Sequence, residues 1–194
     1  MTVSSSLAAP GAGIPAIERV VGGLQLKWLC LTCDLSETLA RFEAERELVT
    51  QLTASTSATA AAQRVLIPRL PGLEDSSRDW SEWMTLEHLR IVNAQIANVV
   101  SLLMRGQVPP GLGASTAAVK PRADVDAAVC AQFQLACDQL VDSARELMQA
   151  GMRRPLARYR HPWFGELDAR QWLVMAAMHM GIHRRQLVSI QQRR

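Results

Sequence analysis

The sequence predicts an all-α fold, a four-helix bundle in which one long crossover joins the second and third helices. Strand signals are scarce, whereas apolar residues recur at three- and four-residue steps in four long segments. The link between the second and third segments, residues 105–122, contains three prolines and three glycines. A connection of this length is unusual in a compact domain unless it has a distance to cover between two elements. It can run the length of a bundle, so that the second and third helices point in the same direction.

The four expected helices follow from this periodicity and from their end signals. We expect the first at about residues 24–52 and the second at 81–104. The third is expected at 124–150, with Gly151 as its C-terminal stop. The fourth begins at Asp168, which stands three residues before a glutamine as in a capping box, and runs to the end of the chain. The residues expected to face inward from the first helix are Trp28, Leu31, Leu35, Leu39, Phe42, Val49 and Leu52.

Length and composition set the broad class of the protein. The 194 residues suggest one domain, which we place at residues 21–194 after a flexible N-terminal tail of residues 1–20 that is rich in Ser, Ala, Gly and Pro. The net charge of +3 does not favour nucleic-acid binding. No apolar run reaches the roughly 18–20 residues of a membrane span, and the first residues lack the pattern of a secretory signal. We therefore expect a cytoplasmic protein that binds neither nucleic acid nor membrane.

Two of the four histidines lie in an otherwise apolar segment, "AAMHMGIHRRQ". His179 and His183 are four residues apart, so in a helix they share one face, with Cβ atoms about 5–6 Å apart. That face continues the apolar positions that precede the pair, so both imidazoles should point toward the core. Two adjacent buried imidazoles need partners, and a shared metal ion supplies one. The alternative is a pair of structural histidines held by hydrogen bonds.

A third histidine, His88, lies on the apolar face of the second helix. If the second and fourth helices pack side by side, His88 can complete a three-nitrogen site with His179 and His183. Three protein ligands leave a coordination position open, as in catalytic rather than structural zinc sites. A zincin-type hydrolase is not supported, because Met180 stands where the HExxH motif requires Glu.

Two blocks of sequence carry a resemblance to a known family. "DWSEWMTLEHL" (79–89) and "HPWFGELDARQWLVMAAMHMGIHRRQ" (161–186) resemble the DinB-like family of metal-binding four-helix bundles. The matching features are the Trp-Ser that enters the second helix, the His-Leu pair, the HPxFG turn, the Gln-Trp pair and HxxxH. Together they extend the resemblance over about residues 24–192.

The resemblance implies a function as well as a fold. It implies a divalent metal ion, zinc or nickel, bound by His88, His179 and His183, and a homodimer. It also implies a thiol S-transferase that joins a low-molecular-weight thiol to a small-molecule electrophile in a detoxification reaction. A metal ion would lower the pKa of the thiol, and the thiolate would attack an electrophilic carbon. The alternatives are a non-catalytic metal-binding or stress-associated protein and a metal-dependent hydrolase that activates water.

The remaining candidates receive ordinary structural interpretations. Cys30 and Cys33 form a CxxC that could be a redox pair or a second metal site, but we expect all four cysteines to be packing residues. His161 should anchor the HPWFG turn. Glu87 is expected to be a solvated surface residue, and Gln186 an ordinary packing or surface residue. A basic cluster that we expect to be solvated, with attraction of an anionic thiol as the alternative, comprises Arg153, Arg154, Arg158 and Arg160.

Overall fold

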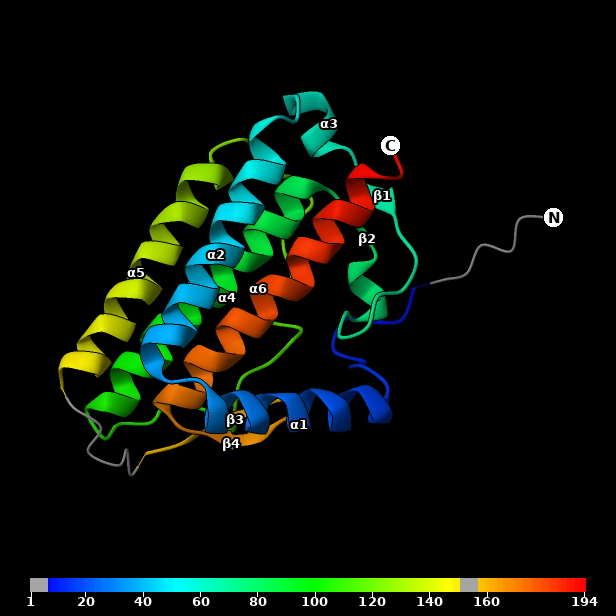
Figure 1. The fold of residues 1–194 in the computed structure, drawn as a ribbon. Helices are drawn as coiled ribbons and strands as arrows, with labels where there is room; N and C mark the ends of the chain where they lie inside the picture. The colour runs from blue at the N-terminus through cyan, green and yellow to red at the C-terminus, as the bar shows by residue number, and fades with distance from the viewer. Residues whose placement is uncertain (1–6, 151–156) are drawn as a thin grey trace.

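Four long helices pack along one another in the computed structural model, which describes residues 7–150 and 157–194 (Figure 1). They confirm the expected bundle. The four helices of the bundle are α2 (Leu35–Ala54), α4 (Glu82–Met104), α5 (Val129–Gln149) and α6 (Ala169–Gln191). The described residues also form the α-helices α1 (Ala16–Thr32) and α3 (Ala58–Ala62) and a short 3-10 helix, η1 (Asp75–Ser77). Two antiparallel strand pairs lie at the ends of the helices, β1 (Val65–Leu66) with β2 (Asp79–Trp80) and β3 (Tyr159–His161) with β4 (Gly165–Leu167).

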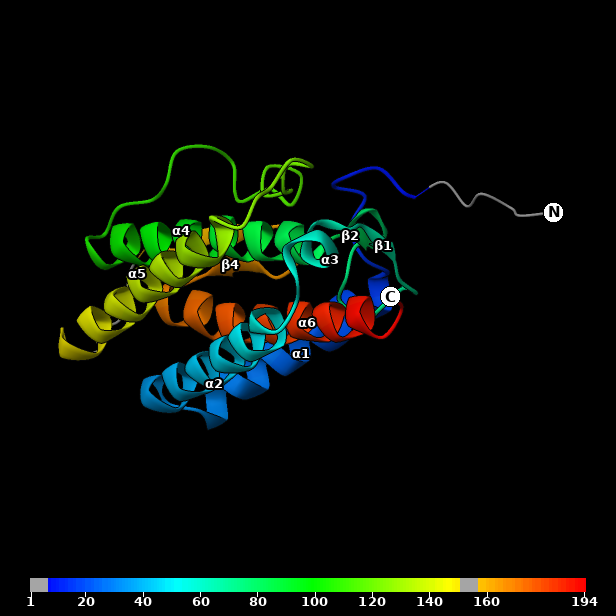
Figure 2. The same ribbon diagram turned by 90° about the horizontal axis from the view of Figure 1, so that it is seen from above.

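The expected crossover is also confirmed. α4 and α5 run in the same direction, and the connection between them returns along the bundle from one end to the other (Figure 1). Side-chain contacts agree with this direction, because Asn93 contacts Cys137 and the next turn of α4 at Ala97 contacts Ser143. Figure 2 shows the crossover arching over α4, on the side of the bundle away from α2. This path lays residues 114–120 beside the end of α4 that carries His88.

The expected single first helix is wrong. The chain breaks at Cys33–Asp34 into α1 and α2, and α1 lies across the end of the bundle (Figure 1). The Asp34 side chain accepts a hydrogen bond from the backbone N–H of Glu37, and the Glu37 side chain accepts one from the backbone N–H of Asp34. This capping box begins a new helix and outweighs the apolar periodicity that continues across it. As a result, Leu31 is 85% exposed rather than buried.

The expected tail of residues 1–20 is wrong for its second half. α1 already begins at Ala16, and Ile14 is buried. The backbone N–H of Ala8 donates to Asp75 Oδ2 at 2.8 Å, which ties the preceding segment to the body. Residues 1–6 lie outside the described residues.

The other helix ends agree more closely with the sequence. The capping box at Asp168 is confirmed, and Ser81 caps α4 by accepting a hydrogen bond from the backbone of Met84. α5 begins at Val129 rather than 124, because Asp126 Oδ1 accepts the backbone N–H of Ala128 and so offers the chain a turn instead of a helix. The expected stop at Gly151 lies outside the described residues.

One apolar core joins the four helices. Its members come from every helix of the bundle and include Phe42, Val49, Leu89, Val100, Leu103, Phe133, Leu140, Ala176, Met180 and Leu187. The HPWFG turn between β3 and β4 closes at Gly165, whose φ of +74° falls in the left-handed region that glycine adopts without strain. No helix among the described residues has the length and apolar character needed to cross a membrane.

Candidate metal centre

Three histidines from two antiparallel helices meet at one point. His88 lies in the second turn of α4, and His179 and His183 lie one turn apart in α6. The Nε2 atom of His179 is 3.1 Å from Nε2 of His88 and 3.1 Å from Nε2 of His183. One ring nitrogen from each histidine lies within 4.8 Å of the others. The structure therefore brings together the three residues that the sequence singles out.

The outer nitrogens of two of these rings have fixed hydrogen-bond partners. His88 Nδ1 is 2.7 Å from the carbonyl oxygen of Val119 in the crossover, and His183 Nδ1 is 2.6 Å from Oε1 of Gln186. Both partners can only accept, so each Nδ1 carries the hydrogen. In a neutral imidazole the other nitrogen, Nε2, then presents a lone pair. Two lone pairs therefore point at the position where the third ring also arrives.

Burial keeps these imidazoles neutral. It lowers the pKa of His88 to about 4, and it lowers the pKa values of His179 and His183 well below the usual value. The neighbouring rings lower the values for His179 and His183 further, since a charge on one ring disfavours a charge on the next. A neutral imidazole is the form that binds metal, so metal binding here does not have to compete with a proton near neutral pH.

The donor set fits a divalent metal ion. The two N···N contacts at 3.1 Å need a hydrogen or a cation between them. The Nε2–H tautomer of His179 could donate to one neighbour only and would leave the other lone pair without a partner. In addition, His179 Nδ1 is buried and has no hydrogen-bond partner. A cation shared by three imidazole nitrogens is the usual chemistry of such a group.

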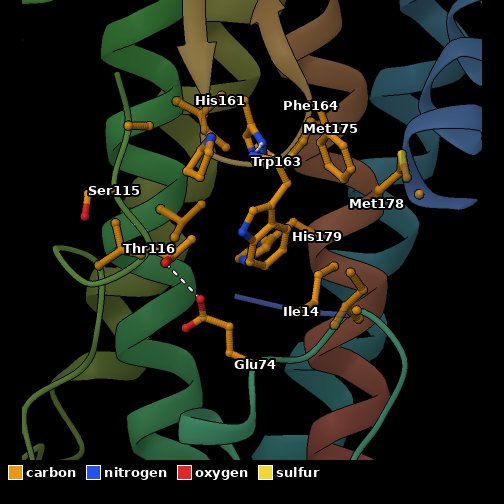
Figure 3. Close-up of a pocket in the computed structure, with 18 of the residues that line it drawn as sticks. Ile14, Glu74, Ser115, Thr116, His161, Trp163, Phe164, Met175, Met178 and His179 are labelled. Carbon is orange, nitrogen blue, oxygen red and sulfur yellow. Dashed lines mark hydrogen bonds between the residues drawn. The ribbon is translucent and has the colours of Figure 1, made fainter. Parts of the chain in front are cut away.

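The centre opens on a large cavity. Within residues 7–150 and 157–194, no fourth His, Cys, Asp or Glu joins the three histidines. All three line a cavity of about 610 Å³ between α1, α4, α6, the crossover and the HPWFG turn. Figure 3 shows Trp163 reaching from that turn toward His179, with Glu74 beyond it. A ligand in the cavity would therefore reach the centre directly.

A buried tryptophan packs against two of the three histidines. The ring of Trp80, which is buried, lies parallel to that of His183 at 6.2 Å between centroids and 5.2 Å from that of His88. The ammonium group of Lys120 lies 5.4 Å from the centroid of Trp80. Trp80 thus keeps water from this side of the rings and supports their orientation.

The loop after β1 and the crossover hold the groups that bind the Nδ1 sides of His183 and His88. A buried ion pair between Glu74 and Lys120 joins these two loops. Gln186, which orients His183, donates through Nε2 to the carbonyl oxygen of Ser77 at 2.7 Å. Lys120, next to the Val119 carbonyl that orients His88, donates to Ser77 Oγ at 2.9 Å and to Glu74 Oε2 at 2.5 Å. The Glu74–Lys120 pair therefore fixes the position of Val119, which binds His88, relative to that of Ser77, which holds Gln186.

Glu74 is also held by other contacts. It is 5% exposed, and its Oε1 accepts hydrogen bonds from Thr116 Oγ1 and from the backbone N–H of Gly13. Burial alone would raise the pKa of this carboxyl, but the hydrogen bond and charge of Lys120 outweigh burial, so the pKa lies below its usual value. The N-terminal segment, the loop after β1 and the crossover meet at this one carboxylate.

One sequence expectation near the site is wrong, and a second is incomplete. Glu87 is not solvated: it is 4% exposed and forms a two-point ion pair with Arg90 at 2.7 and 2.9 Å. Gln186 is completely buried and orients His183, a role that the sequence analysis missed. The signal was available, because a residue three positions after a helical histidine lies on the same face. The partners Val119 and Ser77 contribute backbone carbonyls from loops, and no residue pattern marks them.

His161 has the anchoring role expected of it. Its Nδ1 accepts the backbone N–H of Trp163 at 3.1 Å, and its ring stacks on Phe164 at 4.7 Å. His161 also lines the cavity, although it is not one of the converging histidines. Burial lowers its pKa to about 4.

The cysteines mostly behave as packing residues. Cys33 and Cys137 are buried and Cys30 is half-buried, whereas Cys130 is exposed, contrary to expectation. Burial raises the pKa values of Cys30 and Cys137, which disfavours the reactive thiolate. Of the basic cluster, Arg158 and Arg160 are exposed, and Arg153 and Arg154 lie outside the described residues.

Comparison with known proteins supports the fold. No protein-family model matches the chain, and no curated protein matches it significantly. Among solved structures, the chain is similar to TT2238, described as a four-helix bundle protein, with 24% identity and a TM-score of 0.55. The similarity covers 78% of this chain and 96% of the other. At this identity the likeness supports the four-helix bundle alone, and the resemblance to the DinB-like family is not confirmed by a family model.

Proposed function

We propose that this chain is a DinB-like protein that binds one divalent metal ion and acts as a thiol S-transferase on small electrophiles. The observation that carries the proposal is the open geometry of the centre. Three imidazole nitrogens lie within 4.8 Å of one another, without a fourth protein ligand among the described residues, at the wall of a cavity of about 610 Å³. A purely structural site has its coordination closed by protein side chains.

The chain's own residues would bind and orient the reactants. His88, His179 and His183 would hold the ion, and Val119 and Gln186 would fix the two outer rings. The ion supplies positive charge that lowers the pKa of a thiol beside it. In the transfer, a bond forms between the thiol sulfur and an electrophilic carbon, the leaving group departs with the bonding electrons, and the thiol proton passes to water.

Zinc or nickel is the ion that we propose. Imidazole nitrogen is a borderline ligand that suits zinc, nickel and copper, whereas magnesium and calcium prefer oxygen ligands. The neutral state of the three rings is compatible with this choice because no proton has to be displaced at neutral pH.

The test is turnover by protein loaded with zinc or with nickel. Cysteine or glutathione is supplied with monochlorobimane, which becomes fluorescent when sulfur displaces its chloride. We expect metal-dependent turnover that is lost in His179→Ala and kept in Gln132→Ala, an exposed position on α5. Metal binding without turnover would favour the non-catalytic alternative, and hydrolysis of an ester without a thiol would favour the hydrolase.

We also propose that the chain forms a homodimer through α1. Leu24, Trp28 and Leu31 follow one face of this helix and are 61%, 59% and 85% exposed. A contiguous apolar face of this kind is a common mark of an interface. Sedimentation velocity should give a dimer for the wild type and a monomer for Leu24→Glu/Leu31→Glu. The matched control is Leu112→Glu, at a crossover residue that is 98% exposed; a wild-type monomer would refute the proposal.

A further inference from the structure

The walls of the cavity beside the three histidines are largely apolar. α4 contributes Val92, Ile96 and Val99, all buried, and α6 contributes Met175 and Met178. Methionine side chains are flexible and polarizable, so this wall can adapt to ligands of different shape. A surface of this composition favours binding through burial of apolar area rather than through directed hydrogen bonds.

Two further walls are aromatic and aliphatic. Trp163 and Phe164 come from the HPWFG turn, with their rings edge to face at 6.3 Å between centroids. Figure 3 shows Trp163 beside His179 inside the cavity. Ile17 and Val21 of α1 line the cavity although they are 69% and 56% exposed, so they lie at its rim. A molecule that enters past α1 would meet the histidines at the far wall.

Three of the four charged residues that line the cavity are paired. Glu74 and Lys120 bind each other, and Glu18 at the α1 side binds Arg69 through two contacts at 2.5 and 2.6 Å. The other basic residue on the lining is Arg185, which is exposed. Among the described residues, the interior therefore offers no unpaired cation for a carboxylate or phosphate. Burial of an anionic group there would cost desolvation without compensation.

We propose that the cavity binds an uncharged, largely apolar molecule, whose apolar body lies between α1, α4, α6 and the HPWFG turn and whose polar end lies beside the three histidines. The volume of about 610 Å³ matches a ligand of drug size. The function proposed above implies that this polar end is the reacting electrophile. Binding of the apolar body does not depend on that function. The second reactant, the thiol, then approaches from the rim.

A series of alkyl hydroxamic acids tests the binding of the apolar body. The head, which binds zinc as the anion, stays the same along the series, and the chain length varies the apolar body alone. Isothermal titration of zinc-loaded protein with two-, four-, six- and eight-carbon hydroxamates should show affinity rising about fourfold per added methylene, as expected for burial of each CH₂. Val21→Trp, which fills the rim, should flatten this dependence. Its matched control is Val20→Trp, an adjacent residue that is 57% exposed and does not line the cavity.

Binding of 1-octanol to metal-free wild-type protein separates the two proposals. Saturable binding that is lost in Val21→Trp and kept in Val20→Trp would support the apolar site even if no metal binds. Hydroxamate affinity independent of chain length, or no saturable octanol binding to the folded protein, would overturn this inference and leave the metal centre standing.

Discussion

At the scale of single residues, the geometry of the centre depends on the side chains that hold the histidines as well as on the histidines themselves. Gln186 is the clearest case, because its two amide ends join His183 Nδ1 to the carbonyl oxygen of Ser77. This arrangement fixes both the tautomer and the tilt of the ring. Residues that orient metal-binding histidines fix the ring orientation and raise the basicity of the nitrogen that binds the metal.

Replacement of Gln186 by Leu should weaken zinc binding by about 10–100-fold, because His183 loses the acceptor that fixes its Nδ1–H. The measurement is a competition titration against a chromogenic zinc chelator. Gln132→Ala, at an exposed position of α5, is the control and should keep the wild-type affinity. Equal affinity in Gln186→Leu and wild type would show that this hydrogen bond does not organise the centre.

His161 gives a prediction for pH that does not involve the three converging histidines. Its pKa of about 4 lies below the unfolded value near 6.5, so the unfolded chain binds an extra proton as the pH falls below about 6.5. The stability contributed by neutral His161 is thus present above pH 6.5 and is lost as the pH falls toward 4. Between pH 7.5 and pH 5 this loss is on the order of 2 kcal/mol.

Urea denaturation of the metal-free protein at the two pH values measures this effect. His161→Asn, which keeps a hydrogen-bond acceptor but has no titrating ring, should lose less stability than the wild type over the same interval. The comparison cancels the titration of the carboxyl groups common to both proteins. Equal losses would mean that His161 is not buried in its neutral form.

At the scale of elements, three loops meet beside the centre and hold groups that orient its histidines. The N-terminal segment, the loop after β1 and the crossover meet at Glu74, which is paired with Lys120. Breaking a buried pair leaves an uncompensated charge, which costs more than the pair contributes. The Val119 and Ser77 carbonyls on either side of the pair would then lose their fixed positions.

Lys120→Met should therefore lower the free energy of unfolding by roughly 3 kcal/mol and weaken zinc binding as well. Lys27→Met, a change at an exposed position of α1, is the matched control and should leave both quantities unchanged. Chemical denaturation and the chelator titration measure them separately. Loss of stability with unchanged zinc affinity would separate the loops from the centre and contradict the proposed positioning role.

At the scale of the whole molecule, the bundle, the crossover direction and the meeting of His88 with His179 and His183 could all be predicted from the sequence. The bundle and the histidine group follow from a short-range rule, the 3.6-residue period, whereas the crossover follows from the length of the link between the second and third helices. The break between α1 and α2 was missed because the apolar stripe continues through Cys33 and Asp34, while the Asp34–Glu37 capping box acts locally against it.

The loop carbonyls that hold the histidines and Gln186 could not be predicted either, and the reason is different. Val119 and Ser77 act through backbone carbonyls, which every residue has, and they reach the histidines only after the crossover and the loop before β2 have packed. The cavity likewise depends on where α1 lies across the bundle. Only Gln186 carried a readable signal, three residues after His183.

The central claim is that the three histidines hold one divalent metal ion, and metal content tests it most directly. Mass spectrometry for metals on protein purified without a histidine tag should find about one equivalent of a divalent ion, zinc or nickel. His183→Ala should lose it, while His161→Asn, which removes the one histidine outside the group, should keep it. No bound metal in the wild type, even after incubation with zinc and with nickel, would contradict the account.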